Sequence, residues 1–143
     1  MTDSQELITK LKNQHSNLQK DLSLIVADLK SGMGEKDDTV VLKLTKFKND
    51  LIEHLKIENK EFYPDYLDKK IKRGEEITSA KEFIKQMDTI EKVVIEFLDK
   101  YATPESISAN TSNFSSELSV IINALNARVE TEEEGLFGLY LLL

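Results

Sequence analysis

The chain has 143 residues, a length that predicts one domain with a single hydrophobic core. It contains no cysteine, which excludes disulfides, thiolate metal sites and cysteine nucleophiles. Its formal net charge of −7 argues against a nucleic-acid or anionic-membrane partner, because such partners require basic surfaces. The chain shows no secretory signal and no apolar run of transmembrane length, so we expect a cytoplasmic protein.

The N-terminal half predicts two amphipathic helices separated by a turn at Ser31 to Gly34. The first helix is expected from about Ser4 to Leu29, and the second from near Asp38 or Thr39 to about Tyr63. Apolar residues alternately three and four positions apart form a narrow seam on each helix, as in helix bundles. The seams are Ile8, Leu11, His15, Leu18, Leu22, Ile25 and Leu29, then Val40, Leu44, Phe47, Leu51, His54, Glu58 and Phe62.

The C-terminal half predicts two further helices of the same kind. Pro64 is expected to stop or kink the second helix, with a short charged extension over residues 65–73. A capping box at Ser79 predicts the start of the third helix, and Thr103 is a second expected N-cap. The helical pattern of the fourth helix is clear from Phe114 onward. The two seams are Phe83, Met87, Ile90, Val94, Phe97 and Tyr101, then Phe114, Leu118, Ile121, Leu125, Arg128, Glu132 and Leu136 or Gly135.

Four amphipathic helices with short connections predict an all-α fold, an antiparallel up-down-up-down four-helix bundle over residues 1–143. In such a bundle the polar seam residues fall at one level. His15 lies about 19 residues before the first turn at Gly34, and His54 lies about 20 residues after it. Met87 and Arg128 lie at similar separations on either side of the third connection. The sequence therefore predicts one shared polar layer.

The spacing of His54 and Glu58 is typical of metal ligands, since residues four apart project from the same face of a helix. The C-terminal stretch repeats this spacing, with Arg128 in place of the histidine and Glu132 as the carboxylate. Ionisable groups are costly to bury alone, and they are normally paired or bound to metal. The seam positions of His15, His54, Glu58 and Glu132 therefore make these residues candidate metal ligands.

A histidine on the first helix, the run from His54 to Pro64 and a degenerate copy on the fourth helix resemble the hemerythrin-like His-His-Glu cation-binding family. The resemblance covers almost the whole chain. It implies a four-helix bundle in which histidines and two bridging carboxylates hold a pair of irons. Carried over by position, His15 and His54 match the histidines of one iron, and Glu58 and Glu132 match the bridging carboxylates. Met87 and Arg128 stand where histidines of the other iron are expected.

These departures leave two readings open. In the first, His15, His54, Glu58 and Glu132 hold at most one divalent ion, and Arg128 replaces the charge of the second metal. In the second, the bundle is a metal-free interaction scaffold in which Arg128 pairs with Glu58 and Glu132. Met87 offers only a soft thioether, and the guanidinium of Arg128 cannot ligate.

The leading interpretation is a hemerythrin-like protein with a degenerate site that holds at most one ion of iron, zinc or manganese and serves a sensing, metal-related or stress-related role. A di-iron centre is not expected, and neither is enzymatic activity, although a mononuclear iron enzyme remains a third reading. The partner would be a metal ion or small ligand, and the chain a monomer or homodimer. The sequence does not choose among the metals.

Other side chains have simpler interpretations. Tyr63 is expected to cap the bundle end rather than join the site, and Glu130, Glu133 and Glu134 are expected to form a solvated helix face. The apolar run from Leu139 to Leu143 either packs beneath the Phe62 region or covers a dimer contact.

Overall fold

A computed structural model describes residues 3–31 and 39–143 of the chain. Over these ranges the backbone is helical almost throughout and contains no strand, so the predicted all-α class is confirmed. The turn expected at Ser31 to Gly34 lies, beyond Ser31, outside the described residues. The elements in chain order are α1 (Ser4–Ser31), α2 (Thr39–Ile57), the π-helical turn η2 (Glu58–Phe62), α3 (Tyr63–Lys72), α4 (Thr78–Lys100), α5 (Pro104–Ser108), α6 (Thr111–Thr131), the π-helical turn η3 (Glu132–Leu136) and α7 (Phe137–Leu142).

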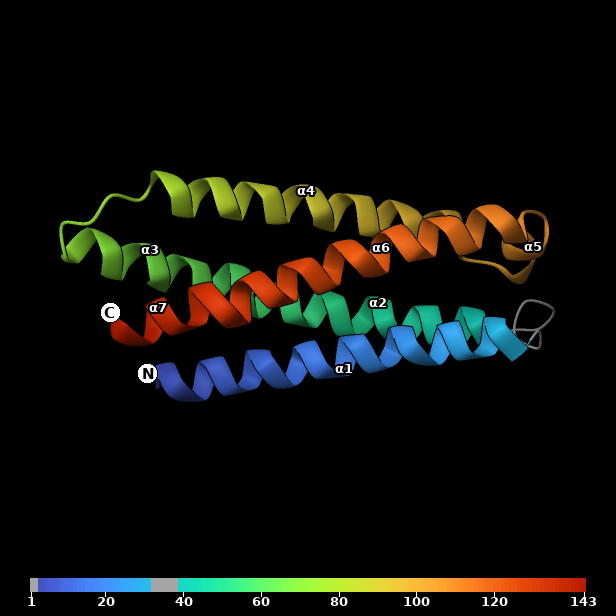
Figure 1. Cartoon of the computed structure of the whole chain (residues 1–143), viewed down its shortest axis with the longest axis horizontal. Helices are drawn as coiled ribbons and strands as arrows, with labels where there is room; N and C mark the ends of the chain where they lie inside the picture. Colours follow the sequence, from blue (N-terminus) through green and yellow to red (C-terminus); the bar gives the residue numbers. More distant parts are fainter. Residues whose placement is uncertain (1–2, 32–38) are drawn as a thin grey trace.

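The long helical runs lie side by side along the long axis of the molecule (Figure 1). They are α1, then α2 continued through η2 into α3, then α4, and finally α6 continued through η3 into α7. α1 packs on α2, α2 on α4, α4 on α6, and α6 and α7 on α1. Both termini lie at the same end of the molecule. Each run therefore contributes one face to a shared interior.

The two π-helical turns begin at the two candidate carboxylates. In η2 the N–H of Tyr63 donates to the carbonyl of Glu58, and in η3 the N–H of Phe137 donates to the carbonyl of Glu132. Such turns insert one extra residue into a helix and occur frequently at functional sites. Pro64 follows the first turn and lies in the first turn of α3, where its missing N–H is tolerated. The expected helical extension after Pro64 is thus present as α3.

The helix starts agree only partly with the sequence. Thr103 is the N-cap of α5, and it forms a reciprocal capping box with Ser106. The capping box expected at Ser79 is wrong, because α4 begins one residue earlier, at Thr78, and its N-cap is Ile77. The carboxylate of Glu76 accepts a hydrogen bond from the N–H of Thr78 in its place. This carboxylate therefore satisfies one of the free N–H groups at the start of α4.

The buried apolar residues form two clusters, and the expected seams supply most of the larger cluster but fewer than half of the smaller one. One cluster fills the end of the molecule that carries the start of α2 and of α6. The other fills the end that carries both termini and is centred on Phe62 and Phe137. His15 on α1 lies in the chain between Leu11 of the second cluster and Leu18 of the first. The candidate ligands therefore form a polar layer where the two apolar clusters meet.

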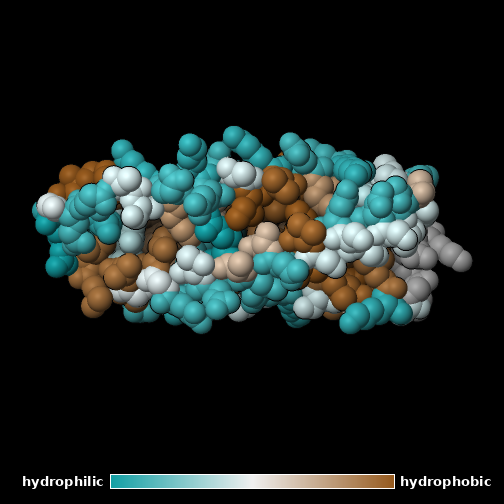
Figure 2. Space-filling model, turned by 45° about the horizontal axis from the view of Figure 1, so that its top comes forward, coloured by the Kyte–Doolittle hydropathy of each residue, from teal (hydrophilic) through white to brown (hydrophobic). Residues whose placement is uncertain are grey.

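The C-terminal apolar run packs on the bundle end through Tyr140. This buried ring makes an edge-to-face contact with Phe62, with centroids 5.1 Å apart, and its hydroxyl donates to Asp65. Leu139 and Leu142 stay exposed. On the face shown in Figure 2, apolar areas interrupt a largely hydrophilic surface. The first of the two expected placements is therefore present for Tyr140 but not for these leucines.

Candidate metal centre

The candidate ligands come from three helical runs and are all buried. His15 projects from the middle of α1, His54 from the last turn of α2, and Glu58 and Glu132 from the first positions of η2 and η3. Their exposed fractions are 1%, 3%, 0% and 1%. Burial of four ionisable side chains in one layer is costly without compensating partners. The hydrogen-bond and charge partners of these four side chains therefore determine whether the layer can bind a cation.

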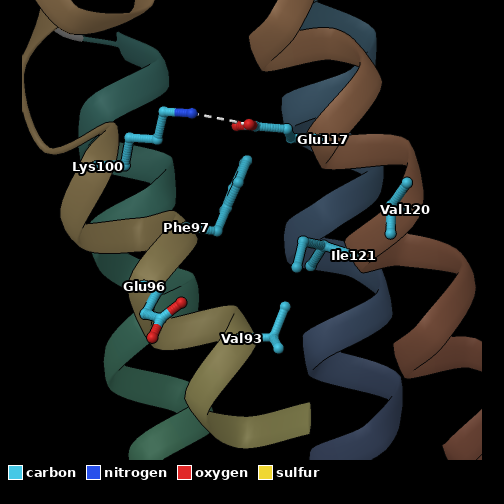
Figure 3. Close-up of a pocket in the computed structure, with 7 residues that line it drawn as sticks. All are labelled: Val93, Glu96, Phe97, Lys100, Glu117, Val120 and Ile121. Atoms are coloured by element: carbon cyan, nitrogen blue, oxygen red, sulfur yellow. Dashed lines mark hydrogen bonds and ion pairs between the residues drawn. The ribbon is translucent and has the colours of Figure 1, made fainter.

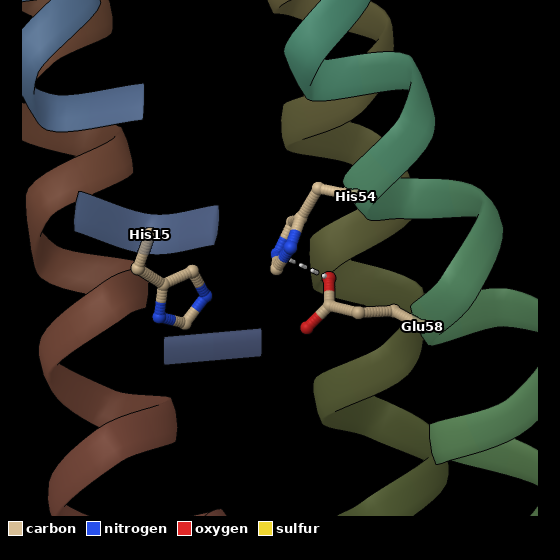
Figure 4. Close-up of side chains that lie close together, drawn as sticks. All are labelled: His15, His54 and Glu58. Atoms are coloured by element: carbon tan, nitrogen blue, oxygen red, sulfur yellow. Dashed lines mark ion pairs between the residues drawn. The ribbon is translucent and has the colours of Figure 1, made fainter. Parts of the chain in front are cut away.

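The histidines and Glu58 converge on one point between α1 and α2 (Figure 4). The rings of His15 and His54 are edge to face with centroids 4.7 Å apart, which confirms the expected shared level. Nε2 of His54 lies 3.2 Å from Oε1 of Glu58. One ligand atom from each of His15, His54 and Glu58 lies within 4.8 Å of the other two. Neighbouring ligands on a metal at about 2.1 Å are about 3 Å apart, so this arrangement suits a bound cation.

Glu132 approaches the same point from η3. Its Oε1 lies 4.0 Å from Nε2 of His15, on the side facing His54 and Glu58. Glu58 and Glu132 are close enough for each to shift the pKa of the other. The structure thus brings all four predicted ligands into one layer, with Glu132 farther from its nearest histidine than Glu58 is from its own.

The outer nitrogens of the two imidazoles have hydrogen-bond partners that the sequence did not indicate. Nδ1 of His15 lies 2.7 Å from Oε2 of Glu133, and Nδ1 of His54 lies 2.7 Å from Oε1 of Gln14. Glu133 was expected on a solvated helix face, and that expectation is wrong, because its side chain is only 33% exposed. A Glu-Glu pair opening η3, and a Gln directly before His15, were the available signals.

Several inward-facing atoms of the layer are buried and have no hydrogen-bond partner among residues 3–31 and 39–143. They are Nε2 of His15, both carboxylate oxygens of Glu58 and Oε2 of Glu132. All four atoms are acceptors when the imidazole proton sits on Nδ1 and the carboxylates are ionised. Orphaned buried acceptors are rare in native proteins and require an explanation. A cation at their centre would satisfy all of them together.

The histidines are held neutral. Burial lowers the pKa of His54 to about 4, against an opposing effect of the Glu132 charge. Burial and then the neighbouring His54 lower the pKa of His15, although Glu132 and Glu133 act in the opposite direction. A neutral imidazole is the form that ligates a metal. Both histidines are therefore in the ligating form at neutral pH.

The carboxylates are harder to ionise than in water. Burial raises the pKa of Glu58 to about 6, although the neighbouring side chains of Glu132 and Tyr63 act to lower it. Burial and then Glu58 raise the pKa of Glu132 well above its ordinary value. Two carboxylates forced together compete for one proton when no cation lies between them. A divalent ion would remove this cost, because it stabilises both ionised forms.

Tyr63 lies nearer the carboxylates than expected. It was predicted to cap the bundle end, yet its ring is buried and its hydroxyl influences the pKa of Glu58. Burial raises the pKa of Tyr63, with smaller contributions from the charges of Glu58 and Glu132. Tyr66, by contrast, packs between Phe62 and Tyr140 and takes no part in the layer.

The α4 and α6 side of the layer is built differently. The guanidinium of Arg128 stacks on the ring of Phe83 at 4.3 Å and donates to the carbonyl of Phe83 and to the side chain of Gln86. Within residues 3–31 and 39–143, Arg128 forms no ion pair with Glu58 or Glu132, so the expected pairing is absent. Met87 is buried in the apolar cluster, as predicted for a core residue. Arg128 therefore binds α4 and leaves the carboxylates without a protein cation.

A small cavity of about 30 Å³ adjoins the layer on this side. It has room for one or two water-sized molecules. Its polar lining comes from His15, His54, Glu91, Arg128 and Glu132, and its apolar lining includes Met87 and neighbouring leucines and valines. The residues present therefore fit one cation with a small ligand, and nothing larger.

A larger groove lies on the surface between α4 and α6, away from the histidines. It encloses about 330 Å³ and is lined by Val93, Glu96, Phe97, Lys100, Glu117, Val120 and Ile121 (Figure 3). Lys100 and Glu117 close one end of it through an ion pair of 2.8 Å. The groove brings together no metal-ligating set, so the candidate site is the inner layer.

Comparisons with known proteins agree with the buried layer. No curated protein and no solved structure gives a significant match to the chain. Among the helices of residues 3–31 and 39–143, none combines the length and apolar character needed to cross a membrane. The family model described as "Hemerythrin HHE cation binding domain" matches residues 5–140. The chain therefore belongs to the hemerythrin HHE cation-binding domain family.

Proposed function

We propose that the chain binds one divalent cation, iron, zinc or manganese, through His15, His54, Glu58 and Glu132. The single observation that carries this proposal is the set of buried acceptor atoms without partners, which come from three of these residues and point at one another. Two neutral imidazoles and two carboxylates carry a charge of −2, which one divalent ion balances. A set of two nitrogen and two oxygen donors suits each of these metals.

In the described part of the chain, a second metal finds no matching set of ligands. At the level of the first site, α4 offers Met87, whose thioether is a poor ligand for metals in carboxylate-rich sites. On α6, Arg128 cannot ligate, and its guanidinium is already bound to Phe83 and Gln86. We therefore expect a mononuclear, degenerate version of the family site.

The metal-free scaffold alternative finds less support. It required Arg128 to neutralise Glu58 and Glu132, and the contacts of Arg128 lie elsewhere. Two adjacent buried carboxylates without a cation destabilise the bundle, because at least one of them must stay protonated. A dedicated scaffold gains nothing from keeping them.

The same proposal covers architecture and role. The packing of α1 on α2, α2 on α4, α4 on α6 and α6 on α1 supports one up-down-up-down four-helix bundle domain over residues 1–143.

The cavity of about 30 Å³ is far smaller than the ligand pockets of about 300–1,000 Å³ that hold organic molecules. We therefore infer a cytoplasmic metal-binding or sensing protein, involved in metal handling or stress, rather than an enzyme.

The test is the metal content of protein that has been stripped with chelator, reloaded separately with iron, zinc and manganese, and dialysed. Mass spectrometry should find close to one ion per chain with at least one of these metals. Restoring the two missing histidines with Met87→His and Arg128→His should raise the content toward two. A stripped chain that takes up no metal would overturn the proposal.

A further inference from the structure

Each candidate histidine is held at its outer nitrogen by a side chain from a different helical run. Glu133 in η3 holds Nδ1 of His15 on α1, and Gln14 on α1 holds Nδ1 of His54 on α2. Both distances are 2.7 Å, although one partner is a carboxylate and the other an amide. The two imidazoles thus form hydrogen bonds of the same length with partners of different charge.

These contacts fix the position of the imidazole proton. A carboxylate oxygen and an amide oxygen only accept hydrogen bonds, so Nδ1 donates in both cases and carries the proton. Nε2 of each ring then has a free lone pair, and in both rings Nε2 is the nitrogen nearer a candidate carboxylate. Both histidines are therefore oriented as ligands before any metal arrives.

The π-helical turn η3 presents two consecutive carboxylates to one ring. The wider turn η3 begins at Glu132, and here Oε1 of Glu132 lies 4.0 Å from Nε2 of His15 while Oε2 of Glu133 lies 2.7 Å from Nδ1. The ring is held between two adjacent carboxylates.

We propose that Glu133 is a positioning residue of the metal centre, which fixes the Nδ1–H tautomer of His15 and makes this ring a stronger electron donor than His54. A charged acceptor makes a stronger hydrogen bond than a neutral one, and it draws the Nδ1 proton away from the ring. This raises the electron density on Nε2. Gln14 fixes the tautomer of His54 in the same way without adding charge. The proposal rests on the metal-binding function inferred above.

The tautomer is tested in the metal-free protein by long-range ¹H–¹⁵N correlation spectra of the imidazoles at neutral pH. Wild-type His15 should carry its proton on Nδ1. Glu133→Gln should keep this tautomer, because the amide oxygen still accepts, whereas Glu133→Ala should shift His15 toward the Nε2–H form. Glu134→Gln changes an exposed neighbour in the same turn and should have no effect. An unchanged tautomer in Glu133→Ala would overturn the positioning role, whatever the metal content proves to be.

The donor strength is tested by metal affinity, measured by competition with a chromophoric chelator. Loss of an outer-sphere partner typically lowers metal affinity by about 10–100-fold, so Glu133→Ala should fall in that range. Glu133→Gln should lose several-fold through charge alone, and the reciprocal Gln14→Glu should gain. Glu134→Gln should match the wild type. Equal affinities in the wild type and Glu133→Gln would refute the role of charge, and a wild type without metal would refute the proposed function instead.

Discussion

The two halves of the polar layer share a fold but not a chemistry. On the α1 and α2 side, His15, His54 and Glu58 converge with inward-facing nitrogen and oxygen atoms. On the α4 and α6 side, the corresponding positions are Met87, which is buried in apolar contacts, and Arg128, which is bound to α4. Only Glu132 reaches across from the second side to the first. Apolar packing on both sides of the layer therefore joins the helices also where Met87 and Arg128 stand in place of metal-ligating side chains.

The contrast also shows how a half-buried positive charge can be accommodated without a carboxylate. The guanidinium of Arg128 stacks on the ring of Phe83. It also donates hydrogen bonds to the backbone carbonyl of Phe83 and to the amide oxygen of Gln86. These contacts tie α6 to α4 on the side of the layer that carries Met87 and Arg128. The arginine thus acts as a helix-to-helix contact, and the carboxylates stay available for a cation.

The largest expected effect comes from removing a ligand on the intact side. His54→Ala should lower metal affinity by more than about 100-fold, because loss of a ligand costs more than loss of an outer-sphere partner. The matched change on the other side, Met87→Leu, should leave metal affinity unchanged and cost less than about 1.5 kcal/mol in stability. Chelator competition and thermal unfolding measure both. Equal losses of affinity in the two variants would show that the halves are not different.

A second prediction concerns Glu58, whose ionised carboxylate should destabilise the metal-free fold and also bind the metal. In the metal-free protein, Glu58 has a pKa of about 6 when folded against 4.5 for an ordinary glutamate. Its protonated form therefore stabilises the fold below pH 4.5, and this contribution is lost as the pH rises through 6. Glu58→Gln should then raise the free energy of unfolding of the metal-free protein at pH 7 by about 1–2 kcal/mol, while abolishing metal binding.

The pH dependence is measured as the difference in unfolding free energy between the wild type and Glu58→Gln. This difference should grow between pH 4.5 and 6 and then level off. Taking the difference removes the opposite slope from His54, whose pKa of about 4 makes the fold more stable as pH rises toward 6.5. Glu53→Gln, at an exposed site on α2, is the control and should show no such change. A destabilised Glu58→Gln at pH 7 would contradict the account.

The smallest effect is expected at Arg128. Arg128→Gln loses the contact with the Phe83 ring and one or two hydrogen bonds to α4, which should lower stability by about 1 kcal/mol. Metal affinity should not fall, because the guanidinium does not contact the carboxylates in the described part of the chain. Denaturant unfolding and chelator competition test the two statements. A large loss of metal affinity would show that Arg128 does support Glu58 and Glu132.

Helix periodicity predicted the fold and the level of the site well. The apolar seams identified the buried face of every long helix, and the equal separations of His15 and His54 from the first turn placed their rings together. This works because the rise per residue of a helix is constant, so spacing along the chain becomes height in the bundle. The burial of a seam residue and its level in the bundle can therefore be predicted from the sequence.

The hydrogen-bond and stacking partners of individual side chains were harder to predict from the sequence. The π-helical turns at Glu58 and Glu132 change the direction of the following residues, and nothing in simple periodicity indicates them. Glu133 was consequently placed on a solvated face. Arg128 was expected to pair with the carboxylates, yet its long side chain reaches Phe83 and Gln86 on the neighbouring helix. The direction that a flexible side chain takes depends on tertiary contacts, which spacing alone does not specify.

The most direct test of a one-metal centre is anomalous diffraction from crystals of metal-loaded protein, recorded at the absorption edge of the bound metal. A one-metal centre should give a single anomalous peak enclosed by Nε2 of His15, Nε2 of His54 and the carboxylates of Glu58 and Glu132. No peak at this position, or a second peak beside Met87 and Arg128, would contradict it.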